Sequence, residues 1–340
     1  MATLKVNTLS GIGTEGPVLD GGLHFRSLNY MTLPKGDTTQ RGRGRALFVG
    51  GYAASPIASS VNNISYSQIQ STGTVIDFGD LTLDRWISAS GASSTRAVIA
   101  GGYSAPDRRN TIDFVTIATT SNAIDFGDLI TKRTYVAGFS NLTRSIAGGG
   151  NDGSDNLNSI EFLTIASTGD GTDFGDLSGT RRELVGDCSP TRGLFMGGTT
   201  PTYLNIVEFV TIATTGNAQD FGDLNTATAN GGALSSNTRA IYAGGEAPSY
   251  TNTIEFFTIA SAGNATDFGD LITARSSIYG ATSNNVRGVI VGGYASPGSN
   301  VNSIEHVTIA TTGNAEDFGD LVFRTRGTTA TSDSHGGLVE

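Results

Sequence analysis

Six copies of the pentapeptide Asp-Phe-Gly-Asp-Leu divide this chain of 340 residues into units of nearly equal length. Their first residues lie 47 to 50 positions apart and are Asp77, Asp125, Asp173, Asp220, Asp267 and Asp317. An arginine followed five residues later by Gly-Gly recurs with the same period, as Arg45, Arg96, Arg144, Arg192, Arg239 and Arg287. Two landmarks with one period are the signature of a repeat architecture. The chain is therefore expected to fold as similar units that pack against one another.

Each repeat holds four short segments that are typical of β-strands. β-branched and aromatic residues alternate there with polar ones over five to seven positions, between Gly, Asn, Ser and Pro. In the segment Ile-Glu-Phe-Leu-Thr-Ile-Ala at 160–166, both faces of the expected strand are largely apolar. Both faces of the sheet must then be covered, as they are when four-stranded blades stack radially. The sequence predicts an all-β fold, a β-propeller.

The two ends of the chain indicate how the ring closes. Residues 330–340 align without a gap to residues 281–291, so the sequence stops partway into a new repeat. We expect residues 322–333 to supply the innermost strand of the blade whose other strands come from residues 45–82. This closure hides the sheet edges and gives six blades. A seventh blade, built from residues 22–45 and the C-terminal tail, is the alternative.

Charge separates a short N-terminal arm, residues 1–44, from the propeller, residues 45–340. Residues 1–45 hold six basic and three acidic residues, whereas the whole chain has a net charge of −10. An acidic body repels phosphate backbones, which argues against nucleic acid as a partner. The arm is predicted to be β-rich and to serve attachment or oligomerisation. The sequence contains neither a signal peptide nor an apolar run long enough to enter a membrane.

Residues suited to catalysis or metal binding are few. A single cysteine, Cys188, excludes a disulfide framework and a cysteine-based zinc site. The histidines are His24, His306 and His335, and no nucleophile motif accompanies them. The turn at 170–173 carries two acids, too few for the oxygen shell of calcium, although calcium stays open. We predict no enzyme, no cofactor and no metal site; a carboxylate pair of the glycosidase type is the alternative, but nothing singles one out.

The repeated residues are expected to be structural. The Asp-Phe-Gly of each repeat lacks the other motifs of a kinase, so its Phe is predicted to pack between blades and its Gly to permit a tight bend. Arg45 and its equivalents are predicted to tie blades together through carbonyl groups or through the carboxylates of the pentapeptide. His306, which replaces the Phe of other repeats, is predicted to pack between blades.

The segments after Gly-Gly vary freely between repeats. They are residues 52–61, 103–110, 151–158, 199–205, 246–252 and 294–301. All should emerge on one face, with the uniform Thr-Thr-Gly-Asn-Ala turns on the other. Loops rich in Tyr, Ser, Asn and Pro suit recognition, above all of carbohydrate. The predicted binding residues are Tyr52, Tyr103, Asp107, Arg108, Tyr203, Tyr250 and Tyr294. The alternative is that these are merely tolerant surface loops.

The order of a strand ending in Gly-Gly, an apolar strand, a short aromatic strand and an Arg-led strand resembles the Kelch repeat over residues 45–340. Two departures are visible. Kelch blades usually carry Trp where these copies have the Phe of the pentapeptide, and the Tyr after Gly-Gly occurs only at Tyr52, Tyr103 and Tyr294. The resemblance implies a six-bladed propeller and carries little information on function.

A second resemblance concerns the N-terminal stretch at 21–48, whose Pro-Lys-Gly-Asp-Thr-Thr-Gln-Arg is similar to segments of bacteriophage tail fibres and virion proteins. Repeats with a sequence like that of residues 211–224 also resemble repeats in proteins of marine bacteriophages. The resemblance implies a virion structural protein of tail-fibre or head-decoration type, assembled in the host cytoplasm. Residues 1–44 would bind other virion proteins and form a homo-oligomer, and the propeller would bind a host glycan or receptor. A cellular Kelch-type adaptor or lectin is the alternative, and a purely mechanical role is a third.

Overall fold

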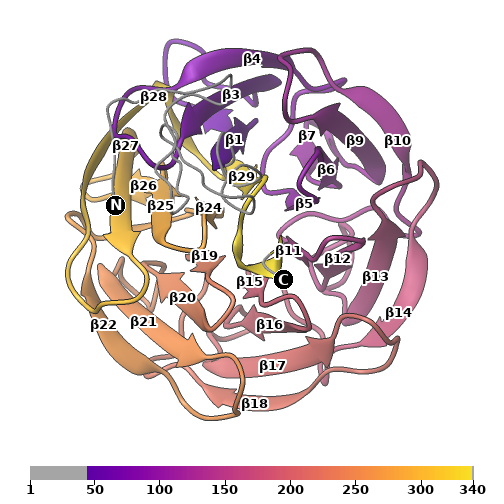
Figure 1. Ribbon diagram of the computed structural model, residues 1–340, viewed down its shortest axis with the longest axis vertical. Helices are drawn as coiled ribbons and strands as arrows, with labels where there is room; N and C mark the ends of the chain where they lie inside the picture. Colours follow the sequence, from indigo (N-terminus) through magenta and orange to yellow (C-terminus); the bar gives the residue numbers. More distant parts are fainter. Residues whose placement is uncertain (1–43, 339–340) are drawn as a thin grey trace, which may run out of the picture. The chain divides into compact units, whose positions relative to one another are not determined.

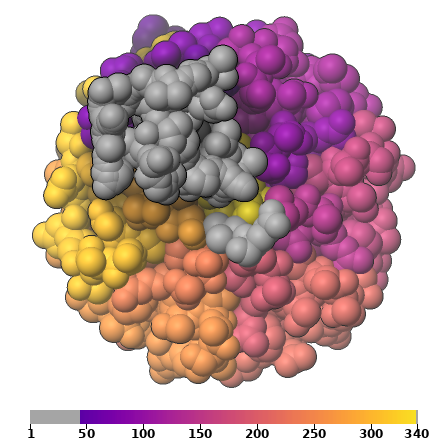
Figure 2. Space-filling view, in the orientation of Figure 1, coloured from indigo at the N-terminus to yellow at the C-terminus, as the bar shows by residue number. Residues whose placement is uncertain are grey.

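The computed structural model describes residues 44–338, and these residues form an all-β propeller (Figure 1). Successive repeats follow one another round the unit that begins at Arg45 (Figure 2). The single helical element among the described residues is the short 3-10 turn η1 (Gly336–Leu338). The prediction of an all-β propeller is thus confirmed, whereas the predicted arm lies outside the described residues apart from Gly44.

Five repeats form separate antiparallel four-stranded blades. The first blade holds β29 (Thr329–Ser332), β1 (Arg45–Val49), β3 (Asn63–Gln68) and β4 (Ile76–Asp80). The second holds β5 (Ala89–Ala92), β6 (Arg96–Ala100), β9 (Thr111–Thr116) and β10 (Ile124–Asp128). The third holds β11 (Ala137–Ser140), β12 (Arg144–Gly148), β13 (Ser159–Thr164) and β14 (Thr172–Asp176). The fourth holds β15 (Val185–Cys188), β16 (Arg192–Met196), β17 (Ile206–Thr211) and β18 (Gln219–Asp223). The fifth holds β19 (Gly232–Ser235), β20 (Arg239–Ala243), β21 (Thr253–Thr258) and β22 (Thr266–Asp270).

The last repeat departs from this pattern, because its strands belong to a seven-stranded sheet. Its main path runs through β24 (Gly280–Ser283), β25 (Arg287–Val291), β27 (Ser299–Thr308), β28 (Glu316–Arg326) and β2 (Tyr52–Ala53). Off this path lie β23 (Arg275–Ser276) and β26 (Tyr294–Ala295), and a separate ribbon joins β7 (Tyr103–Ser104) to β8 (Asp107–Arg108).

The part of the chain that the structure describes therefore has five four-stranded blades, which differs from the six, or alternatively seven, that the sequence predicts. The physical reason is the length of the last hairpin, since β27 and β28 have 10 and 11 residues where other repeats have five or six. The extra length pairs Val301 with Thr325 and gives β2 an edge to join.

The two ends of the chain meet in the first blade. Strand β29 pairs antiparallel with β1, with Ala46 opposite Ser332 and Val49 opposite Thr329. This is the pairing that the alignment of the two ends predicts, and it covers the inner edge of β1. The chain then continues to His335 and η1, whose residues are buried.

The apolar cores lie between adjacent sheets. In β17, Val207 packs in a core shared with the fifth blade, and Val210 packs in a core shared with the third blade. Residues three apart on a strand point to opposite faces, which explains why this segment is apolar on both sides. Each Phe of the pentapeptide is buried in such a core, as predicted; Phe174 and Phe221 are examples. Burial of one such side chain contributes about 1.5–3 kcal/mol.

The recurring arginine is an inter-sheet tie, as predicted. Each guanidinium donates a hydrogen bond to an isoleucine carbonyl of the next sheet at 2.7–3.2 Å. The pairs are Arg45–Ile117, Arg96–Ile165, Arg144–Ile212, Arg192–Ile259, Arg239–Ile309 and Arg287–Ile69. The last pair connects the seven-stranded sheet to the first blade, so the ties run right round the unit. In the first five the guanidinium also lies over an aromatic ring, 4.5 Å from Tyr66 in the case of Arg45 and 4.3 Å from Phe162 in the case of Arg144.

A second contact between sheets explains why the pentapeptide and the Thr-Thr-Gly-Asn-Ala turns are uniform. Gly175 has a φ of 143°, and a Cβ there would lie 2.5 Å from the carbonyl oxygen of Gly216 in the next turn. The amide of Gly216 donates to the carbonyl of Phe174, and the amide of Asp176 donates to the side chain of Asn217. The turn of one sheet is thus bound to the pentapeptide of its neighbour.

His306 takes the place in its sheet that Phe256 has in the preceding blade. Its ring meets Phe318 edge-on at 6.0 Å, close to the geometry of Phe256 and Phe268 in the preceding blade. Burial lowers the pKa of His306 below its ordinary value, which favours a neutral packing residue.

Replacement of Arg144 by methionine tests the tie. The thioether side chain keeps apolar contact with Phe162 but cannot donate to the Ile212 carbonyl, so the free energy of unfolding is expected to fall by about 1–2 kcal/mol. Urea denaturation followed by tryptophan fluorescence measures the change. The control is Lys132→Met in the same repeat, where the side chain is exposed and a change within about 0.5 kcal/mol is expected. Equal midpoints for the two variants would contradict the role of the tie.

Candidate binding face

The segments after Gly-Gly lie at the end of the sheets where the innermost strands begin. In the second blade Ala89, at the start of β5, pairs with Ala100, just before Gly101. The third blade repeats this arrangement with Ala137 and Gly148. All the variable segments and the residues that lead into the innermost strands therefore share one face, which we call the variable face. The uniform turns lie at the other end.

A chain of backbone hydrogen bonds surrounds the centre of the variable face, just before the innermost strands. Amide groups donate to carbonyls of the preceding repeat at 2.8–3.3 Å. The donor and acceptor pairs are Ile87 to Gly327, Tyr135 to Ile87, Glu183 to Tyr135, Asn230 to Glu183, Ile278 to Asn230 and Gly327 to Ser277. Positive φ angles recur here, for example 58° at Ile87 and 66° at Glu183. Such angles cost non-glycine residues about 1 kcal/mol or more and persist where the surroundings impose them.

An arc of aromatic rings follows one side of this centre. Trp86 meets Tyr52 edge-on at 5.3 Å and Tyr103 at 6.4 Å. The guanidinium of Arg326 lies 5.0 Å from the ring centre of Tyr52, 5.4 Å from Trp86 and 4.8 Å from Tyr294. We call this set, with Tyr250, which meets Tyr294 at 6.0 Å, the aromatic arc.

Backbone pairing explains how the arc is assembled. The first residue after Gly-Gly pairs with a residue of the segment that leads into an innermost strand. Tyr103, for example, pairs with Trp86, which lies shortly before β5. The same relation joins Tyr52 to Arg326 and Tyr294 to Ser276. Variable loops therefore present their tyrosines beside side chains of the connecting segments.

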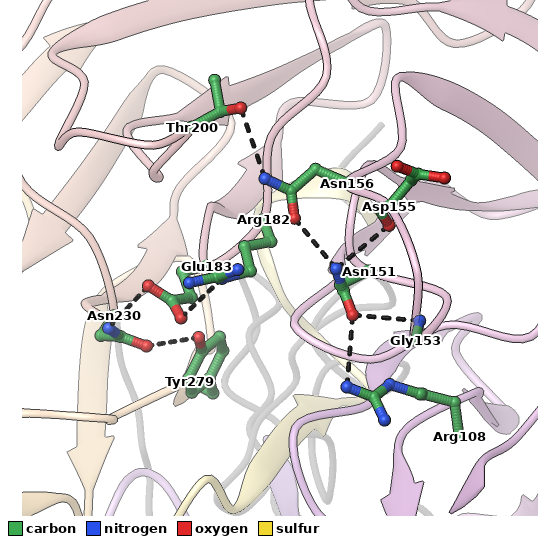
Figure 3. A network of polar contacts seen from close by, with 10 residues as sticks. All are labelled: Arg108, Asn151, Gly153, Asp155, Asn156, Arg182, Glu183, Thr200, Asn230 and Tyr279. Carbon is green, nitrogen blue, oxygen red and sulfur yellow. Dashed lines mark hydrogen bonds and ion pairs between the residues drawn. The ribbon is translucent and has the colours of Figure 1, made fainter.

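The other side of the face carries a network of polar contacts (Figure 3). The guanidinium of Arg108 donates to Asn151 at 3.3 Å, and Asn151 and Asn156 share a hydrogen bond of 3.0 Å. Asn156 in turn donates to the Thr200 hydroxyl at 3.3 Å. Three neighbouring loops are joined in this way, which orients amide groups that can also bind a ligand.

A second polar group lies at the centre, also visible in Figure 3. Arg182 contacts the Glu183 carboxylate at 3.0 Å, and Asn230 donates to the same carboxylate at 3.2 Å. Tyr279 donates to Asn230 at 2.6 Å. Burial and the Glu183 carboxylate raise the pKa of Tyr279 well above its ordinary value, so its hydroxyl keeps its proton as a donor.

Two hollows flank the aromatic arc. One of about 120 Å³ is lined by Trp86, Ile87, Tyr103, Arg108, Thr134 and Tyr135. The other, of about 420 Å³, is lined by Glu246, Pro248, Ser249, Tyr250, Ala274 and Ser296. Each combines an aromatic face with a charged side chain, a combination that fits a polar ligand with apolar CH groups.

The structure brings together five of the residues predicted from the sequence, namely Tyr52, Tyr103, Arg108, Tyr250 and Tyr294. Tyr203 lies beside Glu246, and partial burial together with that carboxylate raises its pKa. Asp107 is exposed on the short ribbon of β7 and β8, and its side chain is not part of the arc.

Sequence reasoning missed Trp86, Tyr135, Tyr279 and Arg326. Trp86, Tyr135 and Tyr279 lie in the connecting segments, and Arg326 is the last residue of β28; both regions repeat with the period of the scaffold and carry no loop signature. The available signal was that Trp86 is the single tryptophan of the chain.

The centre of the unit holds a cavity of about 40 Å³, room for a few water molecules, with His335 of the C-terminal segment in its lining. Asp187, Cys188 and His335 bring possible ligand atoms within 4.8 Å of one another there. The Cys188 thiol donates to the Ser140 carbonyl at 2.9 Å, and burial raises its pKa, whereas metals bind the thiolate. The cluster therefore fits buried packing better than metal binding.

The acidic turn at 170–173 has a structural use. The Asp170 carboxylate accepts a hydrogen bond of 3.0 Å from the amide of Asp128 in the neighbouring blade. This is the place that Asn217 takes in the next turn.

No protein-family model matches this sequence, and none of the curated proteins matches it. Among the described residues there is no helix of the length and apolar character needed to cross a bilayer.

Asp187 predicts a dependence of stability on pH. Burial raises the pKa of this carboxyl to about 7, from an ordinary value near 3.8. Between these values the folded state holds a proton that the unfolded state has lost, so the free energy of unfolding falls as pH rises from about 4 to 7 and then levels off. The fall can reach about 4 kcal/mol.

Urea denaturation of the wild type and of Asp187→Asn between pH 4.5 and 8 measures this effect. The amide cannot ionise, so the stability of the variant relative to the wild type is expected to increase as pH rises. Asp107→Asn, at an exposed carboxylate, is the control. A difference between wild type and Asp187→Asn that is constant with pH would show that Asp187 is ionised in the folded protein.

Proposed function

We propose that this protein is a virion structural protein, of tail-fibre or head-decoration type, whose variable face binds a carbohydrate of the host surface. The observation that carries the proposal is the aromatic arc, in which Trp86 and tyrosines from different repeats gather around Arg326. Aromatic rings offer apolar faces to the CH groups of a sugar, and tyrosine and arginine add donors to its hydroxyls.

The hollow beside Trp86 suits one sugar unit. Its lining places the indole next to Tyr103 and Tyr135, with Arg108 and Thr134 as hydrogen-bonding groups. The guanidinium of Arg108 is also held by Asn151, so it enters the complex already oriented. The larger hollow at Tyr250 and Ser296 would receive a neighbouring unit of the same chain.

Residues 1–44 are proposed to attach the propeller to other virion proteins and to join copies of the chain. The support is the basic arm ahead of an acidic body, together with the resemblance of residues 21–48 to tail-fibre segments. The protein would then reside in the virion after assembly in the host cytoplasm.

A protein adaptor of Kelch type is the second candidate. Tryptophan, tyrosine and arginine are also the residues that dominate protein interfaces. The arc contains all three, so a protein partner would use the same face.

We further infer that the seven-stranded sheet acts as a sixth blade of a Kelch-like ring. Its strands β24, β25, β27 and β28 follow the order of the four-stranded blades. The arginine ties of Arg239 and Arg287 also join it to the sheets on both sides.

A glycan array probed with the full-length protein tests the binding role. Combined replacement of Trp86, Tyr103, Tyr250 and Tyr294 by alanine is expected to weaken binding to any glycan that the wild type retains at least tenfold, because it removes the stacking surfaces. The control replaces Thr119, Ser167 and Thr214, exposed on the uniform turns, by alanine. Equal binding by both variants would reject the variable face, and a wild type that retains no glycan would favour the adaptor.

Light scattering tests the role of the arm. The full chain is expected to form a discrete oligomer, and residues 45–340 are expected to be a folded monomer. Two monomers would contradict assembly through residues 1–44 and leave the glycan-binding proposal standing.

A further inference from the structure

Within residues 44–338, the acidic residue at one position of four sheets forms a buried ion pair with an arginine. The distances between the guanidinium nitrogen and the carboxylate oxygen are 2.6 Å for Arg85–Asp113, 2.8 Å for Arg133–Glu161, 3.3 Å for Arg181–Glu208 and 2.8 Å for Arg275–Glu305. No side chain in these pairs is more than 3% exposed. A charge buried to this degree requires its partner, since removal of one member leaves the other uncompensated.

The arginine also satisfies backbone groups. In the fourth blade Arg181 donates to the carbonyls of Gly197 and Ile206 at 3.2 and 3.1 Å, and Arg133 does the same with Gly149 and Ser159 in the third. Each of these two sites is therefore a cradle of one carboxylate and two carbonyls. A planar guanidinium, with its fork of N–H donors, matches such acceptors better than an ammonium group does.

The fifth blade has the cradle without the arginine. Thr228 stands at the arginine position, because its carbonyl accepts from Gly198 at 3.0 Å as the carbonyl of Arg181 accepts from Gly150 at 2.9 Å. The carboxylate is retained, since Glu255 pairs with Asp267 in the register in which Glu208 pairs with Asp220.

Because Thr228 has a shorter side chain than the arginine of the other sheets, a cavity of about 240 Å³ remains beside Glu255, and we call it the Glu255 pocket. Its lining includes Thr228, Tyr242, Gly244, Thr253 and Glu255, so both carbonyl-bearing residues of the cradle are present. Glu255 is only 6% exposed, and among the described residues its carboxylate forms no ion pair. Asn225 bonds it through its side chain and through its backbone amide, which donates at 3.1 Å. Burial raises the pKa of Glu255, as expected of a carboxylate that lacks its cation.

A second polar group in the pocket is also unsatisfied. Tyr242 is 3% exposed, and its hydroxyl approaches the backbone of Gly231 without a hydrogen bond of ordinary geometry. Buried polar groups in proteins are nearly always paired and buried charges nearly always have a counter-ion, so this hydroxyl and the carboxylate without a cation both indicate an absent ligand.

The first blade provides an internal comparison. There the arginine position is Thr325 and the acid position is Ser65, whose neighbour across the pair is Asp77. With both charges replaced, the corresponding cavity is only about 10 Å³. Of these two blades without the arginine, the fifth alone keeps both the acidic residue and a large cavity beside it.

We propose that the Glu255 pocket binds a guanidinium group from outside the scaffold, carried by an arginine side chain of a partner protein. The pocket reaches the variable face, because exposed Thr226 and Ser249 line it together with Tyr250 of the aromatic arc. The incoming guanidinium takes the place that Arg181 occupies in the fourth blade, against the carboxylate and the carbonyls of Gly244 and Thr253. This site does not depend on glycan binding.

Calorimetric titration of the full-length protein with the peptide acetyl-Gly-Arg-Gly-amide tests the proposal. One site is expected, with at least tenfold weaker binding of the same peptide carrying citrulline, which has the shape but not the charge, and of the lysine peptide. Glu255→Gln should weaken binding at least tenfold, and Thr228→Arg, which restores the internal arginine, should abolish it. Equal binding of the arginine and citrulline peptides, or of wild type and Thr228→Arg, would overturn the proposal.

Arg181→Thr is the matched gain-of-site variant, because it recreates the fifth-blade combination around Glu208. The stoichiometry is expected to rise from one to two peptides per chain. Arginine amide, titrated alongside, separates a small-molecule site from a peptide site, and binding of the amide at least tenfold tighter than that of the peptide would reject a protein partner. If Arg181→Thr does not fold, the Glu255→Gln and Thr228→Arg results decide the question.

Discussion

The contact on which this structure depends is the hydrogen bond from an arginine of one sheet to an isoleucine carbonyl of the next. It recurs from Arg45 to Arg287, and the last copy reaches Ile69 and so joins the end of the repeat series to its beginning. In the first five copies the guanidinium also lies over an aromatic ring of its own sheet, which helps to orient it toward the next sheet. The apolar cores lie in these same gaps, so the ties and the buried Val, Ile and Phe side chains stabilise one arrangement together.

The two faces of the propeller follow from that constraint. On one face the pentapeptide glycine of each sheet contacts the neighbouring turn so closely that no side chain fits, as Gly175 does with Gly216. That face cannot vary without separating the sheets. The loops after Gly-Gly contact mainly each other and the connecting segments, so they are free to differ, and the aromatic arc and the Glu255 pocket both lie on their side.

Much of the fold could be predicted from the sequence because its main contacts recur with the period of the repeat. The strands, the buried Phe residues and the role of the Arg-Gly-Gly landmark were all predicted from aligned copies. The number of four-stranded blades was not, because the long hairpin of β27 and β28 offers an edge to β2, which lies far away in sequence. In the candidate site, the loop tyrosines were predicted, whereas Trp86 and Arg326 were missed because they lie in segments that look like scaffold.

The sequence by itself determined the repeat, the strand pattern and the division into constant and variable segments, since each depends on residues within about fifty positions of one another. Only the tertiary structure decided which side chains from different repeats meet. Trp86, Arg326 and Tyr294 form one surface because sheets distant in sequence lie next to each other. The Glu255 pocket likewise depends on the three-dimensional packing. The threonine at the arginine position indicates a binding pocket because the structure buries the Glu255 carboxylate opposite it.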